Sequence, residues 1–341
     1  MNLIIQGQVY LFLLAFIMII AGIVKDHKLF GDFYGYFHKI LKSKKALIAS
    51  VSALTGCLPI KGRVTLTAGL LDSMAPRGKE RHKLGVIDYL STHHYYFWSP
   101  LEKTVILPMA AFGLTYGAWF GIIWPLLAVS IAFILGYLIW FVKEDGIELD
   151  GIKKEIKISR ITRYVVPYVL GIAGVMAGIH FLWVFGLLTL YYMLVTGTFD
   201  YKKILSYIDW KLLGFIAVII AMANYARVYS PLIHETLYNS GLDITSPTGF
   251  WLISLMSFIG SFILGSSSRF AAITVLLVSV YGLAYLPWFF AVDFCGYILS
   301  PMHKCLAIGK GYFKPPLKYY LTTLITWCSM VILIGGVMLW N

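Results

Sequence analysis

Long apolar runs alternate along this chain with short segments that hold nearly all of its charged residues. The runs at residues 11–23, 117–142, 212–222 and 319–340 are, with their flanks, long enough to cross about 30 Å of hydrocarbon as helices. A helix satisfies its own backbone hydrogen bonds, which lipid cannot do for it. The pattern therefore predicts an all-α membrane protein with about eight transmembrane helices.

Two further apolar stretches are interrupted in their middle. Residues 46–76 lie between two basic segments and are broken at 57–63, whereas residues 249–281 follow a cation-free loop and are broken at 265–269. The tracing through the membrane is consistent only if both stretches turn back inside it. We therefore predict two re-entrant hairpins, the first entered from the cytoplasm and the second from outside.

Each predicted hairpin is followed by a broken helix. These helices cover residues 84–116 and 284–311, and both contain the sequence Ser-Pro-x-x-Lys, at 99–103 and at 300–304. Proline has no backbone N–H and crowds the preceding turn, so each Ser-Pro pair is expected to interrupt its helix. A broken helix exposes free N–H groups and a positive dipole end, which favour an anion.

An internal repeat connects these features. Each hairpin tip carries an arginine, Arg63 or Arg269; Asp88 follows the first by 25 residues and Asp293 follows the second by 24. Because the hairpins enter from opposite sides, the repeat is inverted across the membrane, as in many secondary transporters. The chain thus divides into a first inverted half and a second, residues 1–163 and 164–341.

Composition and charge agree with a lipid environment. The 341 residues are 59% hydrophobic and 13% charged, with a mean hydropathy of +0.79. A net charge of +12 would suggest a nucleic-acid partner if the protein were soluble in water. Here all but six of the 28 Lys and Arg residues fall in four patches, residues 25–45, 77–83, 143–211 and 310–318. The positive-inside rule places these patches in the cytoplasm, so we expect no nucleic-acid partner and an N-terminus outside the cytoplasmic membrane.

Five of the six remaining cations lie at hairpin tips or helix breaks, where buried charge is costly without a counter-charge. Fewer acids than cations lie near these positions, so an excess of positive charge remains for an anion to neutralise. The predicted substrate-binding residues are Lys61, Gly62, Arg63, Thr65, Ser99, Lys103, Ser266, Ser267, Ser268, Arg269, Ser300 and Lys304. The predicted coupling residues are Asp88, Glu102, Asp293 and His303.

Structural alternatives exist for these groups. The tip arginines could cap hairpin carbonyls or hold an acid, and Lys103 and Lys304 could extend to the membrane interface. His303 could relay protons or pack as a hydrogen-bonded residue. The pair His93-His94 has no third ligand nearby, and the cysteines have no paired spacing, so we predict neither a metal site nor a disulfide framework. No catalytic motif appears, which argues against an enzyme.

Several blocks resemble a known family. They are Leu58-Pro59-Ile60-Lys61-Gly62, Ser73-Met74-Ala75-Pro76, Ile87-Asp88-Tyr89, Trp98-Ser99-Pro100-Leu101 and the run from Gly296 to Leu306. Together they resemble an uncharacterised prokaryotic family of the ion-transporter superfamily, which also holds citrate, dicarboxylate, gluconate and lactate carriers. The resemblance implies an inverted-repeat fold with hairpin tips and broken helices around the substrate.

These observations predict a secondary active transporter of a small organic or inorganic anion with elevator-like alternating access. A Na⁺ or H⁺ gradient would drive it, and we expect no cofactor beyond Na⁺ as a possible coupling ion. The expected partners are the anionic solute, membrane lipids and a second copy in a homodimer. The alternatives are a flippase for an anionic lipid such as a polyprenyl phosphate, and a non-transporting membrane sensor or effector.

Overall fold

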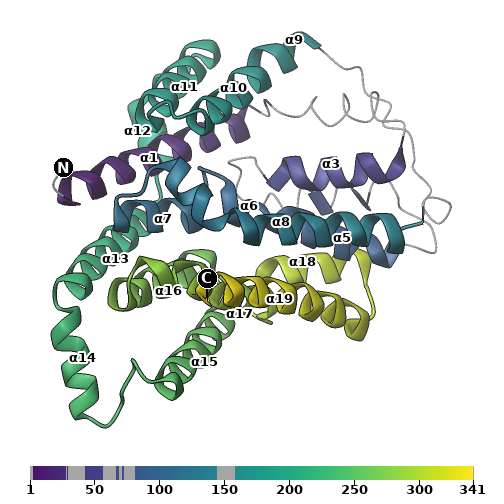
Figure 1. Cartoon of the computed structure of the whole chain (residues 1–341). Coiled ribbons are helices and arrows are strands. Elements are labelled where there is room, and N and C mark those ends of the chain that lie inside the picture. The colour runs from purple at the N-terminus through teal and green to yellow at the C-terminus, as the bar shows by residue number, and fades with distance from the viewer. Residues whose placement is uncertain are drawn as a thin grey trace.

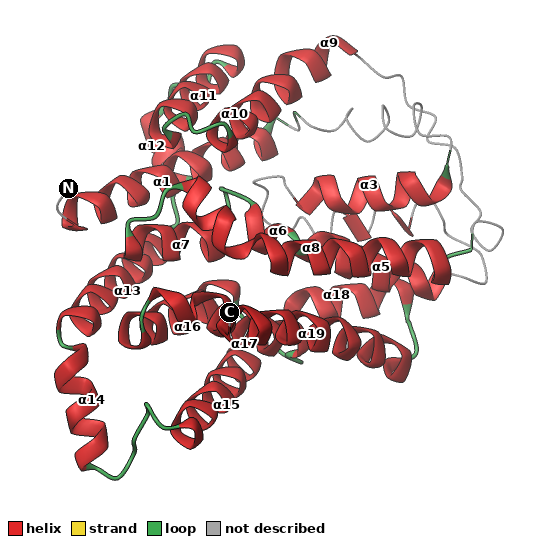
Figure 2. Ribbon diagram, in the orientation of Figure 1, coloured by secondary structure: helices red, strands yellow, loops and turns green. Residues whose placement is uncertain are grey.

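The computed structural model describes residues 3–27, 29, 43–56, 67–68, 71–72, 81–143 and 158–340. Within these ranges the chain forms helices and loops and no strand (Figure 2). The helices are, in chain order, α1 (Leu3–Asp26), α3 (Lys44–Gly56), α5 (Arg81–His93), α6 (Tyr95–Trp98), α7 (Lys103–Phe112), α8 (Tyr116–Phe141), α9 (Ile158–Arg160), a π-helical turn (Ile161–Val165), α10 (Val166–Met176), α11 (Phe181–Thr196), α12 (Tyr201–Ser206), α13 (Trp210–Val228), α14 (Ser230–Asn239), α15 (Pro247–Leu264), α16 (Ser267–Tyr281), a 3-10 turn (Leu283–Tyr285), α17 (Leu286–Leu299), α18 (Lys304–Phe313) and α19 (Leu317–Trp340).

Five of the described helices are long and apolar enough to cross a membrane: α1 (over Gln8–Asp26), α8, α13, α15 and α19. The bent pair Leu283–Leu299 and Lys304–Phe313 gives a sixth if it counts as one span. The chain is thus compatible with an all-α, multi-pass membrane protein. The predicted total of eight crossings stays a prediction, since among the described helices α10 and α11 have 11 and 16 residues, against about 20 for a full crossing.

Apolar side chains cover much of the outer surface of these helices. In the apolar segment of each of the five long helices, only 22% to 44% of the residues are buried inside the molecule. On α8, for example, Trp124, Leu135, Ile139 and Trp140 are exposed. A water-soluble protein rarely exposes so large a contiguous apolar surface, whereas lipid solvates it at no cost.

Two helices form the centre of the molecule. Every residue of α5 from Leu84 to His93 is buried, and so is every residue of α17 from Leu286 to Ile298. The helices α15, α16 and α19 pack around α17, whereas α3, α8 and α18 pack around α5. α8 and α19 lie side by side across the middle of Figure 1 and join the two groups. One core helix, α17, ends at the second predicted break, and the other, α5, leads through the short α6 to the first.

The second predicted hairpin corresponds to α15 and α16, which pack against each other. α15 ends at Leu264 and α16 begins at Ser267, so the predicted break is confirmed. Of the first predicted hairpin, residues 46–76, the structure describes only α3 and residues 67–68 and 71–72.

Close contact between α15 and α17 depends on Gly296. A Cβ atom at this position would lie 2.4 Å from the backbone oxygen of Phe258 and 3.1 Å from the Cβ of Ser261. We expect Gly296→Ala to push the two helices apart and to lower stability by about 1–3 kcal/mol, as overpacking does. Thermal unfolding in detergent checks this.

Gly336→Ala on α19 is the matched control, because its new methyl group would meet only the ring of Trp288 at 3.5 Å, an ordinary contact. An unfolding temperature for Gly296→Ala equal to that of the control would contradict this close approach of α15 and α17.

Candidate functional site

The two Ser-Pro breaks have the same local structure. α6 ends at Trp98 and α7 begins at Lys103, and α17 ends at Leu299 while α18 begins at Lys304. The carbonyl of Ser99 accepts a hydrogen bond from the N–H three residues later at 3.0 Å, and that of Ser300 does so at 3.1 Å. Both predicted breaks are thereby confirmed, and the second bends its helix pair by 42°.

The two break serines are buried and use their hydroxyl oxygens locally. Ser99 Oγ accepts a hydrogen bond from the N–H two residues later at 3.4 Å, and Ser300 Oγ does so at 3.1 Å. These oxygens accept from N–H groups that have no intrahelical carbonyl partner at the break. The serines therefore hold the shape of the break.

The hairpin tip between α15 and α16 lies against the second break. Gly265 has φ of 53°, in the left-handed region that favours glycine. A Cβ atom on Gly265 would lie 2.8 Å from both Ser300 Oγ and Met302 Cβ. The hairpin tip and the second helix break are thus in direct contact. The sequence repeat predicts that tips and breaks belong to one site.

Gly265→Ala tests this contact. We expect the substitution to cost about 1–2 kcal/mol for the left-handed backbone alone, and to displace the tip from the break as well. Thermal unfolding in detergent measures the loss. Gly260→Ala, in the same helix, would meet only the flexible end of Ile273 at 3.3 Å and serves as the control. Equal stability of the two variants would disprove the tight contact.

A cavity of about 520 Å³ lies where three helices begin. The first residues of α7, α16 and α18 contribute Lys103, Ser267, Lys304 and Cys305, and Glu102 precedes α7. From there the cavity extends along α1, α12 and α13, where its lining consists of Leu14, Ile17, Met18, Ala21, Gly22, Lys25, Asp26, Ser206, Tyr207, Asp209 and Leu212. Three helix N-termini, each with a positive dipole end, thus border one space.

Lys103 and Lys304 supply charge to this cavity. Neither ammonium group forms a salt bridge with any residue that the structure describes. Glu102 is buried, and its carboxylate accepts a hydrogen bond from the backbone N–H of Lys103 at 3.2 Å, which caps α7. His303, at the corresponding position before α18, makes no side-chain cap. The start of α18 is consequently the more open of the two to an anion.

Asp293 lies deeper, in the middle of α17, and is fully buried. One carboxylate oxygen accepts hydrogen bonds from Ser257 and, at 3.1 Å, from Ser261; the other accepts one from Thr274 at 2.6 Å. Both arms of the hairpin supply these hydroxyl groups. Sequence reasoning expected a cation beside Asp293, and among the described residues the structure places three hydroxyl donors there.

The remaining predicted residues are distributed differently. Arg269 is exposed in the first turn of α16 and lies outside the cavity lining, and Ser266 and Ser268 share a hydrogen bond at 3.2 Å. Asp88 is buried in α5, at the position that matches Asp293 in α17. The predicted residues Lys61, Gly62, Arg63 and Thr65 lie outside the described part of the chain.

His303 belongs to a buried cluster that sequence reasoning missed. Its ring packs on Tyr297, with centroids 4.0 Å apart, and its Nε2 lies 3.2 Å from Nε2 of His93. Tyr89 hydrogen-bonds to Nδ1 of His303 at 2.7 Å. The members come from both halves of the chain, so no local spacing could have joined them.

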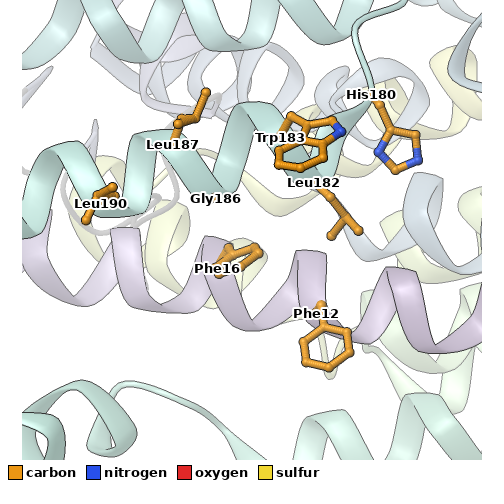
Figure 3. A pocket seen from close by; sticks show the side chains of 8 residues that line it. All are labelled: Phe12, Phe16, His180, Leu182, Trp183, Gly186, Leu187 and Leu190. Carbon is orange, nitrogen blue, oxygen red and sulfur yellow. The ribbon is translucent and has the colours of Figure 1, made fainter.

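A second hollow is apolar. It has a volume of about 460 Å³ and lies between α1 and α11, with Phe12, Phe16, Leu182, Trp183, Leu187 and Leu190 around it (Figure 3). His180 is the only ionisable residue in this lining. Such a surface suits acyl chains, so the polar cavity is the candidate site for an anion.

The model of the family described as a protein of unknown function (DUF401) matches residues 4–340. The chain belongs to this family. The match covers both core helices and both Ser-Pro breaks. No curated protein matches the chain. The family is itself uncharacterised, so the relationship to the ion-transporter superfamily is part of the proposal below.

Proposed function

We propose that this protein is a secondary active transporter of a small anion. The observation that carries the proposal is the meeting of three helix N-termini, with Lys103 and Lys304, in one polar cavity. Helix N-termini stabilise negative charge, and two ammonium groups without a salt bridge to a described acid add to this. An anion of carboxylate or phosphate type would neutralise both, with Ser267 as a hydroxyl donor.

An inverted repeat around this cavity is the second part of the proposal. α3 packs on α5 as α15 packs on α17, and α8 packs on α5 and α6 as α19 packs on α17. The two breaks also share their hydrogen-bond pattern. In this arrangement the hairpins and broken helices would move as a unit against the long spans, giving elevator-like alternating access related to the ion-transporter superfamily.

Coupling to Na⁺ or H⁺ is assigned to the carboxylates. The oxygen-rich surroundings of Asp293 offer hard ligands of the kind that alkali cations prefer, and the carboxylate itself can carry a proton. Asp88, Glu102 and His303 are the other candidates. A buried acid in a membrane helix is costly and in general marks an ion pathway.

Orientation and assembly follow from charge and from the short first half. If the basic segments face the cytoplasm, the cavity opens inward through Lys25, Asp26 and Asp209, and the membrane is the inner membrane of a prokaryote. Among the described helices α1 alone precedes α3, whereas α10, α11 and α13 precede α15 in the second half. A homodimer would supply the scaffold that the first half lacks.

Uptake into proteoliposomes tests the function. The purified protein is reconstituted, a Na⁺ or a pH gradient is imposed, and the entry of labelled carboxylates, phosphate and sulfate is followed. We expect one gradient to drive the entry of one class of anion. No flux of any anion under either gradient would refute the transporter. Transbilayer movement of a labelled phospholipid would favour the flippase instead, and saturable anion binding without flux would favour a sensor.

A further inference from the structure

Three potential metal ligands meet between the two halves of the molecule. His93 comes from the end of α5, His303 from the second break and Cys305 from the first turn of α18. One ligand atom of each residue lies within 4.8 Å of the others. The Nε2 atoms of the two histidines are 3.2 Å apart. Two nitrogens bound tetrahedrally to one Zn²⁺ at its usual bond length are about 3.4 Å apart, so the pair already has chelating geometry.

On both rings Nδ1 has a hydrogen-bond partner, and the two Nε2 atoms face each other. Nδ1 of His93 contacts the backbone carbonyl of Tyr89, which only accepts, so this nitrogen carries the proton. The Tyr89 hydroxyl donates to the carbonyl of Ile298 at 2.8 Å, and therefore accepts from Nδ1 of His303 at 2.7 Å. In both neutral rings Nε2 is then unprotonated. Two unprotonated nitrogens at 3.2 Å are placed so that one cation can bind both.

This pattern is the one that metal-bound histidines show, because the ring nitrogen away from the metal in general donates to a carbonyl or a hydrogen-bonded oxygen. We propose that His93, His303 and Cys305 bind a transition-metal ion of the Zn²⁺ class. Imidazole nitrogen and thiolate sulfur are the ligands that Zn²⁺ prefers. The sequence pair His93-His94 lacked a third ligand, and the fold supplies two from 210 and 212 positions further along the chain.

The site has an inner and an open side. Both histidines are buried, whereas Cys305 is partly exposed and lines the polar cavity. Three protein ligands leave a fourth position for water or for a solute in the cavity. The metal connects α5 of the first half with the start of α18 in the second. This binding stands independently of the proposed transport function.

Metal analysis of the full-length protein tests the site. The protein is purified in detergent, its affinity tag is removed, and it is stripped with a chelator and reloaded with Zn²⁺. We expect about one tightly bound Zn²⁺ per chain by mass spectrometry and a rise in thermal unfolding temperature on loading. Co²⁺ in place of Zn²⁺ is expected to show a thiolate-to-metal charge-transfer band.

Variants locate the ion. His303→Gln and Cys305→Ser should each weaken Zn²⁺ binding by more than about 100-fold. Tyr89→Phe removes the hydroxyl that orients His303 and keeps all three ligands, so it should weaken binding by about 10–100-fold. His180→Gln, in the apolar hollow between α1 and α11, is the matched control and should bind Zn²⁺ as tightly as the unaltered protein does. Cys305→Ser changes one atom, so it keeps the test decisive if the histidine variant fails to fold.

Two results would overturn the proposal. One is an unaltered protein that neither retains Zn²⁺ nor gains thermal stability from it. The other is a Cys305→Ser variant that binds Zn²⁺ as tightly as the unaltered protein, with Co²⁺ lacking the thiolate band in both. The first result would mean that the two histidines share a proton and no metal ion.

Discussion

Uptake of the transported anion is expected to fall by at least about 100-fold when Lys103 and Lys304 are both replaced by glutamine. Both side chains line the polar cavity, and neither has a salt-bridge partner among the described residues. A hydrogen bond to a charged group contributes roughly 1.5–3 kcal/mol, so the loss of two such bonds corresponds to about 10²–10⁴ in binding. Initial uptake rates in proteoliposomes measure the effect.

A variant with the same change in net charge separates the site from a general field effect. Lys310→Gln with Lys318→Gln removes two exposed lysines that do not line the cavity. We expect this control to transport at close to the normal rate. Equal loss in the two double variants would show that overall charge matters and that the cavity lysines do not contact the anion.

Asp293→Ala is expected to produce the largest loss of stability. The substitution leaves Ser257, Ser261 and Thr274 without their carboxylate acceptor in a fully buried position. Hydrogen bonds between membrane helices contribute roughly 0.6–1.7 kcal/mol each, so three of them amount to about 2–5 kcal/mol. Thermal unfolding in detergent, with size-exclusion chromatography to detect aggregation, measures the loss.

Asp293→Asn distinguishes a structural role from coupling. Asparagine has nearly the same shape, keeps one acceptor for the two serines, and lets the Thr274 hydroxyl turn to accept from the amide. We expect this variant to fold with most of its stability and to lose gradient-driven uptake, because it can neither carry a proton nor neutralise a bound cation. Normal coupled uptake by Asp293→Asn would remove Asp293 from the coupling mechanism.

The sequence by itself determined the class of protein and the places where helices stop. Apolar runs partition into lipid one by one, and each contributes its own transfer free energy without needing a partner. The breaks at Ser99-Pro100 and Ser300-Pro301 were predictable for the same reason, since a missing N–H acts on the preceding turn. Both are local properties. The structure confirms the breaks, and its five long apolar helices are compatible with the membrane class.

Only the tertiary structure decided which side chains meet. Arg269 stands at the hairpin tip in sequence but is exposed, and Asp293 has hydroxyl groups where a cation was expected. His93 was set aside as a metal ligand until the fold placed His303 and Cys305 beside it. Contacts of this kind depend on how helices far apart in the chain cross and rotate against one another. Packing of the whole molecule fixes those angles, and residue spacing along one helix carries no record of them.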